Sequence, residues 1–100
     1  MSIKIENSNG FVKFAIDGSF SMEEAGVFKE EAYQLLQNGK SKFLVDFSNC
    51  NFIDSTGLGM LVAIYKKCAE QGGELSLCSI NDTNVLKVFQ LTRLDKVFEI

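Results

Sequence analysis

Asp54, Ser55, Thr56 and Gly57 stand together in one short segment and are the residues best suited to chemistry. A hydroxyl side chain can act as a nucleophile, and both a hydroxyl and a carboxylate can cap the start of a helix. Ile53 and Phe52 precede the segment, and an apolar helical pattern follows it. The residue types favour two interpretations equally: a plain helix cap, or a functional loop beyond the carboxyl end of a strand.

The sequence argues against most enzyme classes. It contains no His, which removes the usual general base and a common metal ligand. A serine hydrolase elbow needs Gly two residues before the Ser, where Ile53 stands. The Asp-Thr-Gly of aspartic proteases is offset here by Ser55 and occurs in only one copy. The chain also lacks a phosphate-binding loop and a Gly-x-Gly-x-x-Gly run. We expect no catalytic activity, no cofactor and no metal.

Composition indicates one globular domain over residues 1–100, with 46% hydrophobic and 23% charged residues. The net charge is −3 and the basic residues are scattered, so nucleic acid is not an expected partner. No apolar run approaches the ~20 residues of a membrane-spanning helix, and the first residues do not form a secretory signal. The three cysteines show no paired spacing, which favours reduced thiols and a cytoplasmic location.

Hydrophobic periodicity places the strands. Alternation predicts strands at residues 3–6 and 11–16, joined by a turn at Asn9-Gly10. A nearly continuous apolar run at 43–47 is typical of a central strand covered on both faces. Residues 75–78 predict another strand, and residues 97–100 a short closing one.

Three helices are expected between these strands. Ser21 and Glu24 fit a capping box, and the helix they begin ends at Asn38-Gly39. Residues 48–56 are mostly polar and predict a loop, after which a second helix spans Gly57 to Gln71. Asn81-Asp82 can cap a third helix. The resulting fold class is α/β: a small mixed β-sheet of four to five strands, an N-terminal hairpin followed by parallel β-α-β units, flanked by about three helices.

The first two turns of the second helix have almost no polar face. Leu58 and Leu61 belong to an ordinary core stripe, whereas Met60 and Ile64 lie on other faces. Either this helix is buried all round, or it exposes an apolar docking surface beside Ser55. Gly57 and Gly59 slightly favour docking, because glycine allows another backbone to approach closely.

Residues 52–59 are Phe-Ile-Asp-Ser-Thr-Gly-Leu-Gly, Asp46-Phe47-Ser48 lies shortly before them, and residues 91–98 are Leu-Thr-Arg-Leu-Asp-Lys-Val-Phe. These three segments resemble the STAS domain family, as found in bacterial anti-sigma-factor antagonists. They match, in turn, the family signature, its Asp-hydrophobic-Ser and its terminal Leu-Thr-x-Leu-Asp-x-hydrophobic-Phe segment. The resemblance extends over nearly the whole chain and implies a small mixed sheet flanked by helices.

The resemblance also implies a partner switch. In these antagonists, a partner that is both anti-sigma factor and serine kinase phosphorylates the Ser that matches Ser55; Thr56 is the alternative acceptor. The unmodified form binds that partner and frees the sigma factor, the phosphorylated form dissociates, and a serine phosphatase resets the switch. The partner-binding residues expected on this basis are Asp54, Ser55, Thr56, Gly57, Leu58, Gly59, Met60, Ile64 and Ser21.

One position departs from the family pattern. Where the family often has Gly-Glu-Leu-Asp, this chain has Gly18-Ser19-Phe20-Ser21, so Ser21 replaces the acidic residue. The departure favours a second function: a constitutive docking subunit of a lipid-transport ATP-binding-cassette complex, or of a signalling scaffold, without control by phosphorylation. The Ser at the acceptor position favours the switch. The sequence assigns no oligomeric state.

Overall fold

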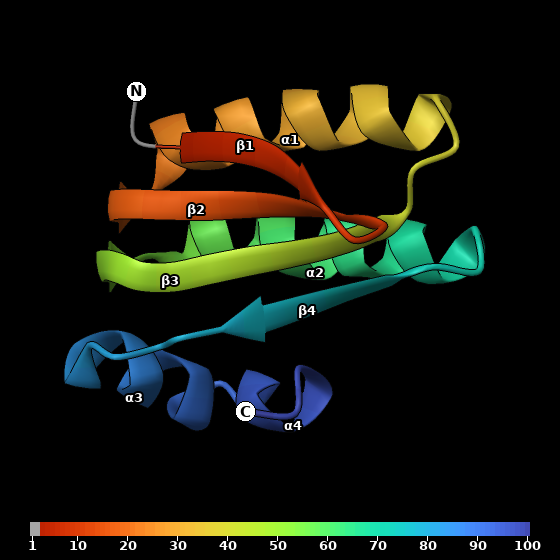
Figure 1. Ribbon diagram of the computed structural model, residues 1–100. Helices are drawn as coiled ribbons and strands as arrows, with labels where there is room; N and C mark the ends of the chain where they lie inside the picture. The colour runs from red at the N-terminus through yellow and green to blue at the C-terminus, as the bar shows by residue number, and fades with distance from the viewer. Residues whose placement is uncertain (1–2) are drawn as a thin grey trace.

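The computed structural model describes residues 3–100, which form four strands and four helices. Figure 1 shows α1 and α2 lying behind the sheet, and α3 and α4 lying beyond β4. The elements are β1 (Ile3–Ser8), β2 (Phe11–Phe20), α1 (Met22–Gln37), β3 (Lys42–Ile53), α2 (Ser55–Glu70), β4 (Glu74–Cys78), α3 (Thr83–Leu91) and α4 (Leu94–Val97).

The sheet follows chain order, β1-β2-β3-β4. β1 is antiparallel to β2, whereas the β2–β3 and β3–β4 pairs are parallel. Asn9 and Gly10 both have positive φ, 52° and 86°, as the tight turn of a right-twisted hairpin requires. The mixed α/β sheet with an N-terminal hairpin, predicted from the sequence, is confirmed.

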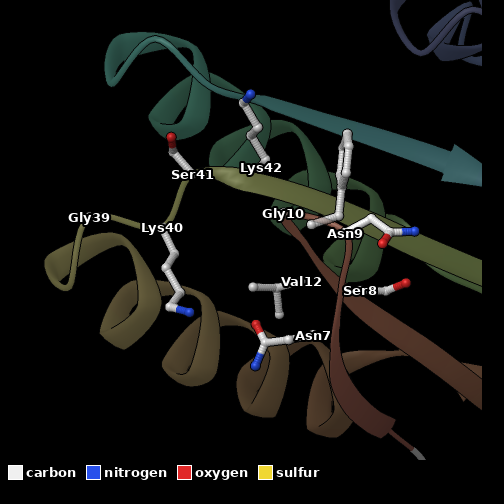
Figure 2. Close-up of a pocket in the computed structure, with 10 residues that line it drawn as sticks. Asn7, Ser8, Asn9, Gly10, Val12, Gly39, Lys40, Ser41 and Lys42 are labelled. Carbon is white, nitrogen blue, oxygen red and sulfur yellow. The ribbon is translucent and has the colours of Figure 1, made fainter.

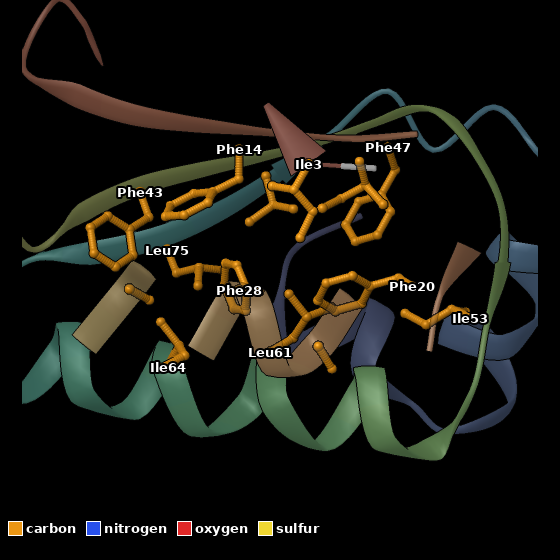
Figure 3. Close-up of a cluster of buried hydrophobic side chains, with 14 of the residues drawn as sticks. Ile3, Phe14, Phe20, Phe28, Phe43, Phe47, Ile53, Leu61, Ile64 and Leu75 are labelled. Atoms are coloured by element: carbon orange, nitrogen blue, oxygen red, sulfur yellow. The ribbon is translucent and has the colours of Figure 1, made fainter. Parts of the chain in front are cut away.

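A cluster of phenylalanines fills the space between the sheet and its helices (Figure 3). Phe14 of β2 meets Phe28 of α1 and Phe43 of β3 edge-to-face, with ring centroids 4.9 Å and 5.3 Å apart. These rings alternate with half-buried or exposed residues along the strands, which is why period-two patterning found the core. Phe47 extends the cluster to Phe89 of α3 at 6.0 Å.

The expected loop at residues 48–56 is wrong, because β3 continues to Ile53. Two register irregularities, between Ala15 and Asp17 and between Gly18 and Ser19, offset β2 against β3 in this region. They break the simple alternation and allow polar residues to continue the strand. Cys50 and Ile53 bury their side chains from this extension.

The closing strand expected at residues 97–100 is also wrong. Arg93 adopts a left-handed conformation, with φ 66°, and turns the chain into the short helix α4. Phe98 then packs edge-to-face on Tyr65 of α2 and on Phe89 of α3, with centroids 5.3 Å and 6.2 Å away. The apolar residue that suggested a strand therefore joins the helical side of the core. No helix within residues 3–100 has the length and apolar character needed to cross a membrane.

Candidate functional site

Two helices begin side by side at one edge of the sheet. Phe20 and Ile53, at the ends of β2 and β3, are register partners in a parallel pair. Ser21 and Asp54 come directly after them and precede α1 and α2. The carboxyl ends of parallel strands meet at one edge, so the sheet brings Ser21 and the Asp54 segment together although they lie far apart in the sequence.

Asp54 is the cap of α2. Its backbone is extended, and its Oδ1 accepts a hydrogen bond from the Gly57 amide at 2.9 Å. Of the three candidate caps, the carboxylate therefore takes this role. Ser55 and Thr56 occupy the first turn of α2 and are both exposed. Within residues 3–100, neither hydroxyl is engaged in a side-chain hydrogen bond, so both remain accessible.

Gly57 lets α2 start directly against β2. A Cβ built at this position would overlap the Phe20 carbonyl oxygen and lie 2.8 Å from the Phe20 ring. The backbone that approaches Gly57 closely therefore belongs to β2 of the same chain, and not to a partner. Gly59 differs, since it is exposed and a Cβ there meets nothing within 4 Å.

The apolar face of α2 is divided between core and surface. Leu58 is buried, and Met60 is half-buried against the core. Ile64 is 0% exposed, so its expected place in a partner-binding surface is wrong. The buried side chain packs in the layer between α2 and the sheet (Figure 3). The helix is neither buried all round nor openly apolar: Ser55, Thr56 and Gly59 are exposed near its start, and Lys66, Lys67, Ala69 and Glu70 are exposed near its end.

Ser21 is the cap residue of α1 and forms a capping box with Glu24. Glu24 Oε1 accepts from the Ser21 hydroxyl at 2.9 Å, from the Ser21 amide at 3.3 Å and from the Ser19 hydroxyl at 3.4 Å. Its own backbone amide and the Ser21 hydroxyl lower the pKa of the Glu24 carboxyl, although slight desolvation opposes them. An ionised carboxylate is thus held beside Ser21, the residue that stands where the family pattern often has an acid.

Two exposed apolar side chains near this edge went unrecognised in the sequence. Met22, in the first turn of α1, is 73% exposed, and Phe52, near the end of β3, is 53% exposed. Phe52 had a detectable signal, because it is an aromatic residue in a mostly polar stretch directly before the Asp54 segment. Taking that stretch as a loop hid the bulged strand, in which Cys50 and Ile53 turn inward and Phe52 turns outward.

The same edge is acidic. The segments 17–24, 48–59 and 79–86, which follow or end β2, β3 and β4, contain five carboxylates and no Lys or Arg. Burial raises the pKa of the Cys50 thiol, the hydrogen bond to the Phe52 carbonyl opposes this, and the charges of Asp82 and Glu24 raise it further. Asp82 and Glu24 come from separate segments of the chain, yet both carboxylates lie close enough to Cys50 to affect its thiol. The acidic residues are Asp17, Glu23, Glu24, Asp54 and Asp82.

A groove of about 520 Å³ lies at the opposite edge of the sheet, between the β1–β2 turn and the segment that enters β3. Figure 2 shows Lys40 and Lys42 on its walls, pointing away from one another. Diverging amines do not converge on one anion, so this groove is not part of the candidate site. Among residues 3–100, no group of three His, Cys, Asp or Glu side chains is arranged to hold a metal ion.

Comparison with known proteins identifies the family of this chain. The sequence model of the STAS domain matches residues 2–100. This chain belongs to the STAS domain family. The anti-sigma-B factor antagonist of Bacillus subtilis is 24% identical to it over 100 residues, covering 100% of this chain and 90% of the relative.

Solved structures show the same fold. A Thermotoga maritima protein of known crystal structure is 29% identical, covers 95% of this chain and 81% of its own, and superposes with a TM-score of 0.87. The anti-sigma factor antagonist SpoIIAA, in its unphosphorylated form, is 17% identical, covers 98% and 99% of the two chains and gives a TM-score of 0.75. SpoIIAA of Bacillus has also been solved in a phosphorylated form, with the same TM-score. The curated relatives of this STAS domain include several anti-sigma factor antagonists.

Proposed function

We propose that this STAS domain is an anti-sigma factor antagonist controlled by phosphorylation of Ser55. The observation that carries the proposal is that Asp54, and not Ser55, caps the start of α2. The exposed Ser55 hydroxyl is therefore free. The unmodified protein binds an anti-sigma factor that is also a serine kinase, and a sigma factor is released. A serine phosphatase restores the unmodified form. All three steps belong in the cytoplasm, and the antagonist itself catalyses none of them.

The electrostatics of the edge suit such a switch. A phosphate on Ser55 adds about −1.5 to −2 charges. The amino end of α2 stabilises negative charge by about 0.3–1 kcal/mol, so the modified protein stays folded. The segments around it contain no Lys or Arg to neutralise the phosphate. A partner packed over Ser55 would have to desolvate the dianion, and a loss of about 2.7 kcal/mol weakens binding a hundredfold.

Phosphorylation of Thr56 in place of Ser55 is the closest variant of this scheme, since both hydroxyls are exposed in the first turn of α2. Incubation with the purified partner kinase and ATP, followed by peptide mass spectrometry, distinguishes them. Ser55→Ala abolishes incorporation if Ser55 is the acceptor, and Thr56→Ala does not.

Ser21 favours a second function, constitutive docking in a lipid-transport ATP-binding-cassette complex or a signalling scaffold. Its hydroxyl is committed to the capping box and supplies no charge. A pull-down from native lysate with Ser55→Ala and Ser55→Asp baits separates the two functions. Recovery of an ATP-binding, kinase-like protein by the Ala bait alone supports the switch. Equal recovery of one partner by both baits, a transporter ATPase above all, supports constitutive docking.

A further inference from the structure

An apolar groove of about 300 Å³ adjoins the candidate site. It lies between the end of β3 and the first turns of α3, and it reaches the Asp54 cap through Ile53. We call it the Phe52 groove; it is lined by Asn51, Phe52, Ile53, Asn84, Val85 and Val88.

The exposed Phe52 ring is not required by the core. Its neighbour Ile53 is 4% exposed and fills the core position at the end of β3. Phe52 turns the other way, and its register partner on β2 is only Ser19. Large aromatic side chains that stay half in water beside an apolar hollow are characteristic of protein contact sites.

Charge identifies the kind of partner. Asp82 caps α3 at the rim of this groove, where its Oδ1 accepts from the amides of Asn84 and Val85 at 2.9 Å and 3.0 Å. Asp54 and Glu24 lie along the same acidic edge, and the carboxylates there outnumber the one cationic residue in the part of α3 that lines the groove, Lys87. A basic surface gains attraction here, whereas an acidic one is repelled.

We propose that the protein partner bound by this edge inserts an apolar side chain into the Phe52 groove and surrounds it with basic residues that face Asp82 and Asp54. This inference rests on the proposed function and identifies the chemistry of its partner surface. Ser55 then lies beside the anchored region, where a phosphate faces the partner's rim. The Phe52 groove supplies affinity for the partner, and phosphorylation of Ser55 controls whether the partner binds.

Four variants test the inference by calorimetric titration against the purified anti-sigma factor kinase. Phe52→Ala removes the ring, and Asn84→Trp fills the groove from an exposed position. Both weaken binding about tenfold or more, as loss of an interface anchor does. Asp82→Asn keeps an effective cap but removes a charge, so binding weakens and depends less on salt. Ile5→Ala, at a half-exposed apolar position on β1, leaves affinity unchanged.

Urea unfolding of each variant separates lost binding from lost folding, and Asn84→Trp removes no core contact. One outcome would contradict the role of the Phe52 groove and leave the switch intact. In that outcome, phosphorylation weakens binding by the parent, but Phe52→Ala and Asn84→Trp bind the kinase as tightly as the parent does. If the affinity of the parent for the kinase does not change with salt concentration, the partner does not place basic residues opposite Asp82 and Asp54. If the unmodified parent does not bind the kinase, both the switch and this inference fail.

Discussion

Gly57 at the start of α2 lies directly against the Phe20 carbonyl at the end of β2, with no room for a side chain between them. This contact fixes the first turn of α2, and with it Ser55, relative to the sheet edge. The close approach is a property of the fold itself and holds without any partner.

Gly57→Ala is therefore expected to destabilise the protein by about 1–3 kcal/mol, since the added methyl overlaps backbone that cannot move freely. Gly59→Ala is the matched control two residues along the same helix, where the methyl meets nothing within 4 Å. Because alanine favours helix, that variant should gain about 0.5–1 kcal/mol. Urea unfolding monitored by circular dichroism measures both; equal effects of the two substitutions would contradict the contact.

The cap of α2 gives a second expectation. Asp54→Ala leaves the Gly57 amide without its acceptor and should lower the unfolding free energy by about 0.5–2 kcal/mol. Asp54→Asn keeps an oxygen in place and should cost much less, because Asn and Asp cap helices comparably. If Asn costs as much as Ala in denaturant titrations, the charge rather than the hydrogen bond supports the helix.

Sequence reasoning located the Asp54 segment, the core strands and the hairpin because each depends on local periodicity or turn chemistry. It misplaced the end of β3, since a bulged pairing with β2 is a long-range property that alternation does not encode. It placed Ile64 on a docking surface because a helix with few polar residues does not reveal which side its neighbours cover. The exposure of Phe52 depends on the same pairing, so only the folded sheet shows it.

A negative charge at Ser55 should leave the fold intact. Ser55→Glu introduces a carboxylate into the first turn of α2, where the helix dipole stabilises it by about 0.3–1 kcal/mol. We expect the midpoint of thermal unfolding to stay level or rise by a few degrees, with Thr56→Glu behaving alike. A clear fall for Ser55→Glu alone would mean that modification acts by disrupting α2 and not by excluding a partner.

The Glu24 carboxylate should make stability depend on pH. Its folded pKa lies below the ordinary 4.5, so its contribution is complete above that pH and is lost as pH falls through the folded pKa. Glu24→Gln retains the capping geometry but has no titrating group. The unfolding free energy of the variant should decline less steeply than that of the parent between about pH 5 and pH 3. Parallel curves would show that Glu24 is not held as an anion in the folded state.

The three cysteines are free and should react in order of burial. Cys78 is half-buried at the end of β4, whereas Cys50 and Cys68 are buried. Burial raises the pKa of the Cys68 thiol to about 11, so the reactive thiolate is scarce at neutral pH. A disulfide reagent at pH 8 should modify one thiol quickly in native protein and the other two only as urea unfolds it. Cys78→Ser should remove the fast phase of the reaction. If the fast phase persists in that variant, Cys50 or Cys68 must lie at the surface.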